Sequence, residues 1–167
     1  ADATVIVMAD HGEELYHGHI GHARLYDECV RVPFYAKNLD PALEGAAIRQ
    51  LDLAPTIVEG IGLDSPEEWT GEAHDGAHRD SFMINHSFSE GEERVYTGLR
   101  TADAKLIQTH DDTGTVIDTE CYDLAADPIE RNPHSSGASR RTQLAQKLSE
   151  FLTRNSVVEA HVSSRTE

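Results

Sequence analysis

Thr4-Val-Ile-Val-Met8, followed by Ala9 and the triplet Asp10-His11-Gly12, is the stretch of the 167-residue sequence that decides the fold. The run Thr4 to Met8 is apolar and rich in β-branched residues, and polar residues bound it. This pattern predicts a strand buried on both faces, the type found in parallel α/β sheets. Ligands bind α/β sheets in the crevice outside the carboxyl ends of such strands, so Asp10 and His11 are the first candidate site residues.

Two further elements are predicted before residue 63. Residues 31–36 form a second strand candidate, in which Pro33 indicates an edge or a bulge. Residues 51–61 predict a helix with Asp52 as its N-cap and Pro55 in its first turn. Residues 63–79 have little periodicity and several glycines, which predicts a connecting loop.

The remainder of the chain predicts a small antiparallel sheet packed on one terminal helix. Four short strands are expected, and a hairpin turn at 111–114 joins the last two; their ranges are 81–86, 94–100, 105–110 and 115–122. The helix places apolar side chains at helical spacing, namely Leu144, Leu148, Phe151 and Leu152. We therefore expect an α/β protein with four segments: 1–62, the end of an α/β domain; 63–79, a loop; 80–154, the sheet and helix; and 155–167, a frayed tail.

The charge of the chain excludes two classes of partner. Lys and Arg number 14 against 30 Asp and Glu, a formal net charge of −16. Nucleic acids and anionic membranes both require clustered cations, so neither is expected as a partner. No apolar run is long enough to cross a membrane, and no targeting signal is visible at the first residue, which favours the cytoplasm. An acidic, lysine-poor surface is typical of halophilic proteins, although an ordinary acidic protein is the alternative.

The segment from Asp10 to His22 has the densest chemistry, with four histidines in twelve residues. Carboxylate and imidazole side chains are suitable ligands for a divalent cation. The alternative is a capped turn, in which Asp10 bonds to backbone N–H groups and the histidines are merely exposed. Composition alone leaves both interpretations open.

Six motifs occur in the order that they have in one enzyme family: Thr4 to Glu13, Gly21-His22 with Leu25 to Glu28, Arg31-Val-Pro33, Asp52 to Thr56, Leu99-Arg-Thr101 with Lys105-Leu-Ile107, and Cys121 to Arg131. Together they resemble the carboxyl-terminal half of the sulfatase family, in the alkaline-phosphatase superfamily. The resemblance covers residues 4 to 152. It implies the carboxyl-terminal portion of an alkaline-phosphatase-like sandwich.

The resemblance implies roles for three residues. Asp10 and His11 match the family's Asp-(Asn/His) pair, which binds the divalent cation. Calcium is usual in sulfatases, and manganese or zinc is found in related phosphodiesterases and phosphonate hydrolases. His22 stands where many relatives have a lysine that contacts the transferring sulfuryl or phosphoryl group, so it departs from the family pattern.

The other polar residues of these motifs are expected to have structural or solvent-exposed roles. We expect His17 and His19 to be exposed, with a place in the lining of the pocket as the alternative. Glu13 and Glu14 are expected to form a solvated pair, with support of the metal ligands as the alternative, and Asp27 is expected to pair with Arg31. Packing roles are expected for Arg100 and Lys105. Cys29 is expected to be a small buried apolar residue.

The family's nucleophile is absent from the sequence. Sulfatases generate formylglycine from a Cys/Ser-x-Pro-x-Arg motif, and neither Cys29 nor Cys121 has that context. The family's first Asp-Asp metal-binding pair is also missing. The resemblance, taken with these two absences, implies a fragment, inactive alone, of a metal-dependent hydrolase of small sulfate esters. Formylglycine is then expected in the missing amino-terminal part, and that part or another chain would cover the exposed sheet edge.

Two alternatives remain. The parent protein could be a phosphodiesterase or phosphonate hydrolase of the same superfamily, which would act on phosphate esters. A short protein that has lost catalysis and kept a divalent-cation-binding module is the non-enzymatic alternative.

Overall fold

The computed structural model describes residues 3–18, 21–39, 47–89 and 92–155. The chain divides into two compact units. The first unit contains residues 1–9 and 33–79, and the second contains residues 10–32 and 80–167. Residues 10–32 thus group with the sheet of the second unit, although they lie within the expected 1–62 segment. The expected tail, 155–167, lies outside the described residues apart from Asn155.

In the first unit, strand β1 (Val5–Met8) pairs with β2 (Phe34–Lys37) in an antiparallel ribbon. Val5 lies opposite Lys37, and Met8 lies opposite Phe34. The prediction of a parallel strand buried on both faces is wrong, because Val7 is 60% exposed. Among the described residues, β2 is the sole strand paired with β1, so no further strand extends this ribbon into a larger sheet.

Helix α2 (Gln50–Gly60) confirms the expected helix but corrects its start. The N-cap residue is Arg49, and Asp52 lies in the first turn, where it accepts hydrogen bonds from Arg49 Nε at 2.6 Å and Glu72 N at 3.0 Å. Pro55 lies in the helix interior and has no N–H to donate to the Leu51 carbonyl.

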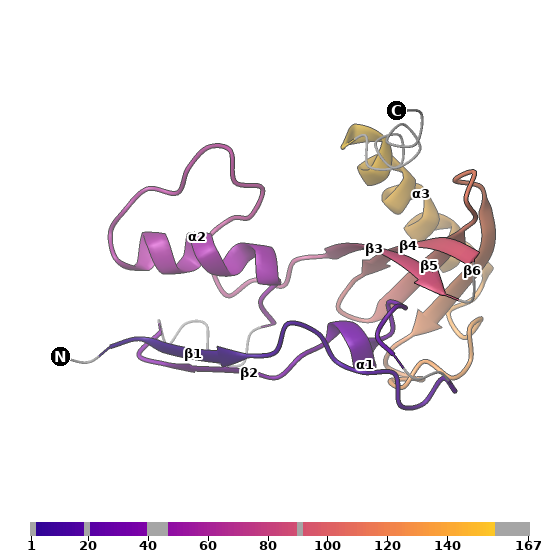
Figure 1. Cartoon of the computed structure of the whole chain (residues 1–167), viewed down its shortest axis with the longest axis horizontal. Helices are drawn as coiled ribbons and strands as arrows, with labels where there is room; N and C mark the ends of the chain where they lie inside the picture. Colours follow the sequence, from indigo (N-terminus) through magenta and orange to yellow (C-terminus); the bar gives the residue numbers. More distant parts are fainter. Residues whose placement is uncertain (1–2, 19–20, 40–46, 90–91, 156–167) are drawn as a thin grey trace. The chain divides into compact units, whose positions relative to one another are not determined.

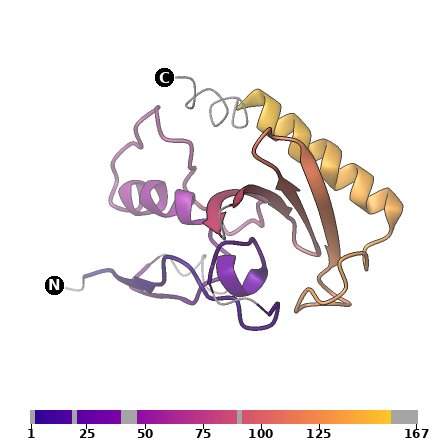
Figure 2. The same ribbon diagram turned by 45° about the vertical axis from the view of Figure 1, so that its right-hand side comes forward.

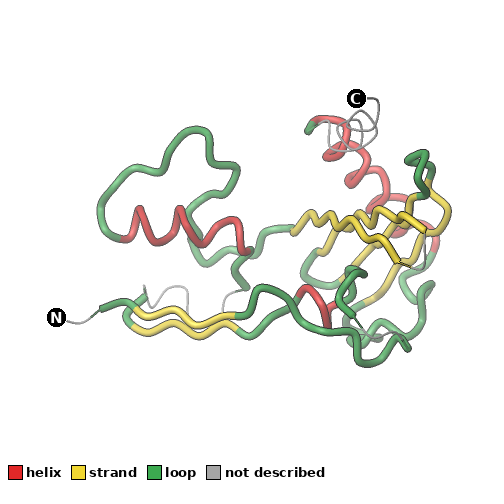
Figure 3. Tube along the Cα trace, viewed as in Figure 1, coloured by secondary structure: helices red, strands yellow, loops and turns green. Residues whose placement is uncertain are grey.

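Gly71 packs against that same carbonyl of Leu51. A Cβ added to Gly71 would lie 1.9 Å from the oxygen, so the position requires glycine. Gly71 belongs to residues 63–79, which have no helix or strand, as the green tube in Figure 3 shows.

The second unit contains a four-stranded antiparallel sheet (Figure 1). Its strands run in the order β3 (Ser81–Ser89), β4 (Glu92–Arg100), β5 (Ala104–His110) and β6 (Val116–Asp123). The predicted hairpin turn is confirmed: the Asp111 carboxylate accepts the N–H of Thr113 and of Thr115, both at 2.9 Å. Gly114 adopts a positive φ of 81° in this turn.

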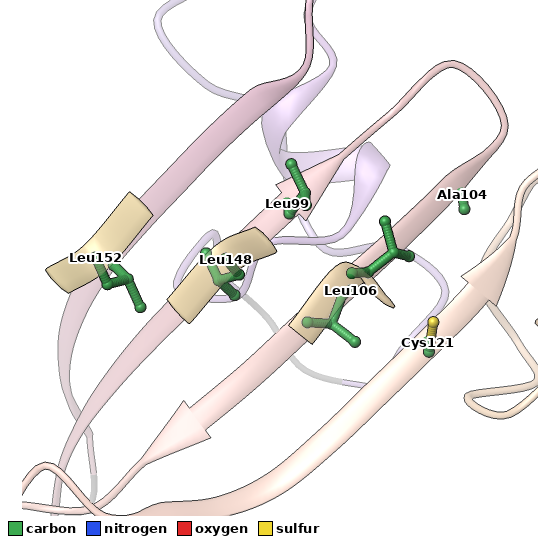
Figure 4. Packing of buried hydrophobic residues seen from close by; sticks show 7 residues of the cluster. Leu99, Ala104, Leu106, Cys121, Leu148 and Leu152 are labelled. Atoms are coloured by element: carbon green, nitrogen blue, oxygen red, sulfur yellow. The ribbon is translucent and has the colours of Figure 1, made fainter. Parts of the chain in front are cut away.

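Helix α3 (Ala138–Arg154) runs along one face of this sheet (Figure 2). Leu144, Leu148 and Leu152 are buried, as their spacing predicts. They meet Leu99 and Leu106 of the sheet (Figure 4). The partly buried Phe151 stacks on Phe82, with ring centroids 3.9 Å apart.

The opposite face of the sheet supports the candidate site. Successive strand residues point to opposite faces, so Leu106 faces α3 while Ile107 belongs to a separate apolar cluster. That cluster also contains Leu25, Tyr26 and Tyr122. Leu25 and Tyr26 immediately precede the short helix α1 (Asp27–Val30), which the cluster therefore anchors to the sheet. In the part of the chain that is described, no helix is long and apolar enough to cross a membrane.

Candidate functional site

The candidate site lies on residues 10–18 and 21–24, which are the described parts of the segment before α1, and the backbone of this site loop is bound to α1. Gly12 N donates to the Cys29 carbonyl at 2.7 Å, and Glu13 N donates to the Glu28 carbonyl at 3.0 Å. A Cβ added to Gly12 would lie 1.9 Å from the Glu28 carbonyl oxygen. The glycine of the Asp-His-Gly triplet is therefore required by this close approach of two backbone segments.

Glu14 and Arg24 close the loop. The Glu14 carboxylate accepts Arg24 Nε at 2.8 Å and Arg24 N at 3.1 Å, and it also forms an ion pair with the Nη2 group. Glu14 is only 4% exposed, so the prediction of a solvated pair is wrong for this residue. A buried carboxylate needs such partners, because leaving its charge unpaired is costly.

His11, Glu13 and His22 come together on this loop. Their potential ligand atoms all lie within 4.8 Å of one another, and all three residues are exposed. The rings of His11 and His22 stack with centroids 3.8 Å apart, and Glu13 Oε2 lies 3.7 Å from His22 Nδ1. The structure thus places the two predicted site histidines side by side and adds Glu13, for which the sequence predicted a solvated role.

Asp10 lies beside this group. Its Oδ2 atom is 3.7 Å from His11 Nε2, and its Oδ1 atom accepts the His11 backbone N–H at 3.0 Å. That backbone hydrogen bond, with the nearby imidazole, lowers the pKa of the Asp10 carboxyl. Asp10 is thus an anionic oxygen donor next to two imidazoles.

These donors fit a divalent cation. Two imidazole nitrogens and a carboxylate oxygen within 4.8 Å of one another form a mixed nitrogen and oxygen set. Such a set suits manganese or zinc, whereas calcium prefers oxygen ligands alone.

His17 lies between the site residues in the loop, and its predicted exposure is wrong. Its side chain is 12% exposed, and both ring nitrogens have acceptor partners: Glu28 Oε1 at 2.6 Å and the Glu130 carbonyl at 2.8 Å. His19, also expected to be exposed, lies outside the described residues. The partners of His17 come from residues 11 and 113 positions away in sequence, and no local sequence signal identifies the more distant one.

A buried ion-pair cluster fixes α1 to the sheet. Asp27 accepts Arg100 Nε at 2.9 Å and Lys105 Nζ at 2.6 Å, and Lys105 Nζ also lies 2.8 Å from Glu130 Oε1. The predicted pair between Asp27 and Arg31 is therefore wrong, because Asp27 is engaged by two cations from β4 and β5. Arg100 and Lys105 have the structural role that the sequence predicts.

The cluster has opposite effects on its two carboxyl groups. Burial opposes ionisation of Asp27, but the hydrogen bonds and charges of Arg100 and Lys105 outweigh it and hold the pKa of Asp27 at about 2. Glu130 is more deeply buried, and desolvation raises its pKa despite the charge of Lys105.

Neither cysteine has the properties of a nucleophile. Cys29 and Cys121 are free thiols and both are buried, as expected for Cys29. Burial raises the pKa of Cys29 to about 12 and also raises that of Cys121. Because the thiolate is the reactive form, both thiols are inert at neutral pH.

The fold matches part of several solved structures. A structure of BT4656 in complex with its substrate D-glucosamine-2-N,6-O-disulfate has a TM-score of 0.70 and 24% identity over 98% of this chain. A structure of BT1596, a 2-O GAG sulfatase, has a TM-score of 0.68 and 24% identity over 90% of this chain. A candidate sulfatase from Bacteroides thetaiotaomicron VPI-5482 has a TM-score of 0.68 and 25% identity, also over 90%.

In all three comparisons, this chain spans 36% of the length of the matched chain. No protein-family model matches the sequence. The predicted resemblance to sulfatases is thus confirmed at the level of the fold, as a mixed α/β segment with antiparallel sheets and a carboxyl-terminal helix.

Proposed function

We propose that this chain is the carboxyl-terminal part of a sulfatase-like, metal-dependent hydrolase of sulfate esters, with an alkaline-phosphatase-like sandwich as the parent fold. The observation that carries the proposal is the convergence of His11, Glu13 and His22 on a loop bound to α1. The fold match to solved sulfatases gives this convergence a chemical context.

In this proposal Asp10 and His11 hold the divalent cation. Glu13 adds a further donor, because its carboxylate belongs to the same group as His11, whereas Asp10 lies outside that group and beside His11. A bound cation would supply positive charge to the oxygens of a sulfuryl group. His22 stacks on His11 beside the cation site, and in this proposal its ring serves the substrate rather than the cation: its N–H would donate to a sulfuryl oxygen. An imidazole does this most strongly when protonated.

Sugar sulfates are the substrate class that we favour. BT4656 is described in complex with a disulfated glucosamine, and BT1596 is described as a 2-O GAG sulfatase. The net negative charge of this chain would not attract such a substrate, so a local positive charge at the site is needed to bind it.

Titration with Mn²⁺, followed by isothermal calorimetry and by electron paramagnetic resonance, tests the cation site. We expect one ion to bind, at least tenfold weaker in His11→Ala and unchanged in the control His134→Ala, which removes an exposed histidine elsewhere. Inorganic sulfate then tests His22: His22→Ala should weaken sulfate binding to the Mn²⁺-loaded chain. Unchanged Mn²⁺ binding in His11→Ala would refute the proposed site.

The second candidate is a divalent-cation-binding module without catalysis. The exposure of all three clustered residues is the observation that favours it, because it leaves the ion open to solvent. This candidate predicts the same Mn²⁺ binding but no affinity of the loaded chain for inorganic sulfate.

A further inference from the structure

The Glu28 carboxylate organises the centre of the site loop. Its Oε2 atom accepts the backbone N–H groups of Leu15 at 2.8 Å and Tyr16 at 2.9 Å, and its Oε1 atom contacts His17 Nδ1 at 2.6 Å. Three consecutive loop residues are therefore bound to one side chain of α1. Although burial opposes it, the His17 hydrogen bond and the two backbone hydrogen bonds lower the pKa of Glu28, so this group is a carboxylate acceptor.

The second nitrogen of His17 reaches a third segment of the chain. Its Nε2 atom lies 2.8 Å from the carbonyl oxygen of Glu130, a residue whose own side chain pairs with Lys105. The His17 ring also stacks on Tyr26, with centroids 3.6 Å apart and an interplanar angle of 5°. One imidazole thus joins the site loop, α1 and the segment that contains Glu130.

Proton counting determines the form of this imidazole. A carboxylate and a backbone carbonyl only accept hydrogen bonds, whereas a neutral imidazole has a single N–H. Both contacts of His17 are satisfied together only by the imidazolium, which has two N–H donors. The other charged or titratable groups that face the ring are Arg24, whose Nη2 donates to the His17 carbonyl at 3.1 Å, and the Tyr26 phenol.

We propose that His17 is a positioning residue which, as the imidazolium, fastens the loop that carries His11, Glu13 and His22. Its ring contacts Glu28, Glu130 and Tyr26 rather than the proposed cation donors, so it acts through the loop. The inference deepens the proposed function and rests on it for its biological meaning. When the ring gives up one proton, one of its two links is lost, and the loop is held on one side only.

Nuclear magnetic resonance of the ¹⁵N-labelled chain tests the inference without any metal. At pH 6 we expect both ring nitrogens of His17 to carry slowly exchanging protons and the amides of Leu15 and Tyr16 to be protected from exchange. The stacked rings of His11 and His22 give a second signal, because each ring shifts the proton resonances of the other. In His17→Ala those mutual shifts should diminish, and the two amides should exchange at least tenfold faster.

His17→Gln keeps the proposal testable if His17→Ala does not fold. Its amide group donates from one nitrogen only, so it can restore one of the two links, and the Leu15 and Tyr16 amides should exchange at rates between those of the wild type and His17→Ala. A single protonated ring nitrogen in the folded protein at pH 6, or unchanged His11 and His22 resonances in His17→Ala, would overturn the inference.

Binding of Mn²⁺ is measured separately on the same variants. A wild-type chain whose His17 ring carries both protons but which binds no Mn²⁺ refutes the proposed function and leaves the role of His17 in the loop established. Equal Mn²⁺ affinity in the wild type, His17→Ala and His17→Gln refutes the positioning role and leaves the cation site intact.

Discussion

Replacing Lys105 by methionine should destabilise the second unit strongly. Lys105 is fully buried, and its Nζ atom lies 2.6 Å from Asp27 Oδ1 and 2.8 Å from Glu130 Oε1. Methionine preserves most of the apolar stem but removes the cation shared by the two carboxylates. Breaking a buried ion pair from one side costs about 3 to 5 kcal/mol, because the remaining charge has lost its partner. Arg100 still neutralises Asp27, so we expect about 3 kcal/mol, the lower end of that range.

Urea unfolding followed by far-ultraviolet circular dichroism measures this loss at pH 7. Lys147→Met is the matched control, because Lys147 forms an exposed ion pair with Asp80, worth at most about 1 kcal/mol. Without Lys105, the pKa of Glu130 should rise further, so protonation relieves the buried charge and the deficit should shrink between pH 7 and pH 5. A loss below about 1 kcal/mol, or a deficit that does not change with pH, would refute the reasoning.

Three further predictions concern the same unit. Gly12→Ala should weaken Mn²⁺ binding at least tenfold in calorimetric titration, since its Cβ would lie 1.9 Å from the Glu28 carbonyl oxygen; equal affinity would contradict the role of the close approach. Leu148→Ala should cost about 2 to 5 kcal/mol in urea unfolding, because this α3 side chain is fully buried against the sheet; a loss under about 1 kcal/mol would show that the core relaxes around it. Asp27 has a pKa of about 2 in the folded chain, against an ordinary value of 3.8. Its ionised form therefore adds about 2 kcal/mol to the free energy of unfolding above pH 3.8, and this stabilisation is lost as the pH falls toward 2. In Asp27→Asn, the free energy of unfolding measured between pH 4 and pH 2 should not show this loss. An acid dependence of stability identical to that of the wild type would contradict the prediction.

The sequence predicts the second unit well because its signals are local. Alternation of apolar residues and a turn rich in Asp and Gly identify the strands, and the helical spacing of Leu144, Leu148 and Leu152 identifies the buried face of α3. The observed strand ends differ from the predicted ones by at most three residues, as with β3, which ends at Ser89 rather than at residue 86.

Long-range electrostatics could not be predicted in this way. Nothing near Asp27 in sequence indicates that its partners are Arg100 and Lys105, which are 73 and 78 residues away. Arg31 is the local choice, and it is wrong because β4 and β5 bring two cations to the same carboxylate. The same reason explains His17, whose distant contact is a backbone carbonyl, a group that every residue has.

Motifs single out Asp10, His11 and His22, and the roles of these residues stay a prediction. Motifs do not show which side chains approach one another, so the sequence favours a solvated role for Glu13, which the structure places beside the two histidines. The predicted burial of β1 failed for another reason. An apolar run shows that a strand can be buried, but its actual burial depends on which elements pack against it.

The placement of two rare residue types gives the chain natural reporters. The single tryptophan, Trp69, belongs to the first unit, whereas both cysteines are buried in the second. Tryptophan fluorescence therefore reports on the unfolding of the first unit, and the rate of thiol alkylation reports on the opening of the second. A single unlabelled sample can thus reveal whether the two units unfold together or in sequence, with no engineered probe.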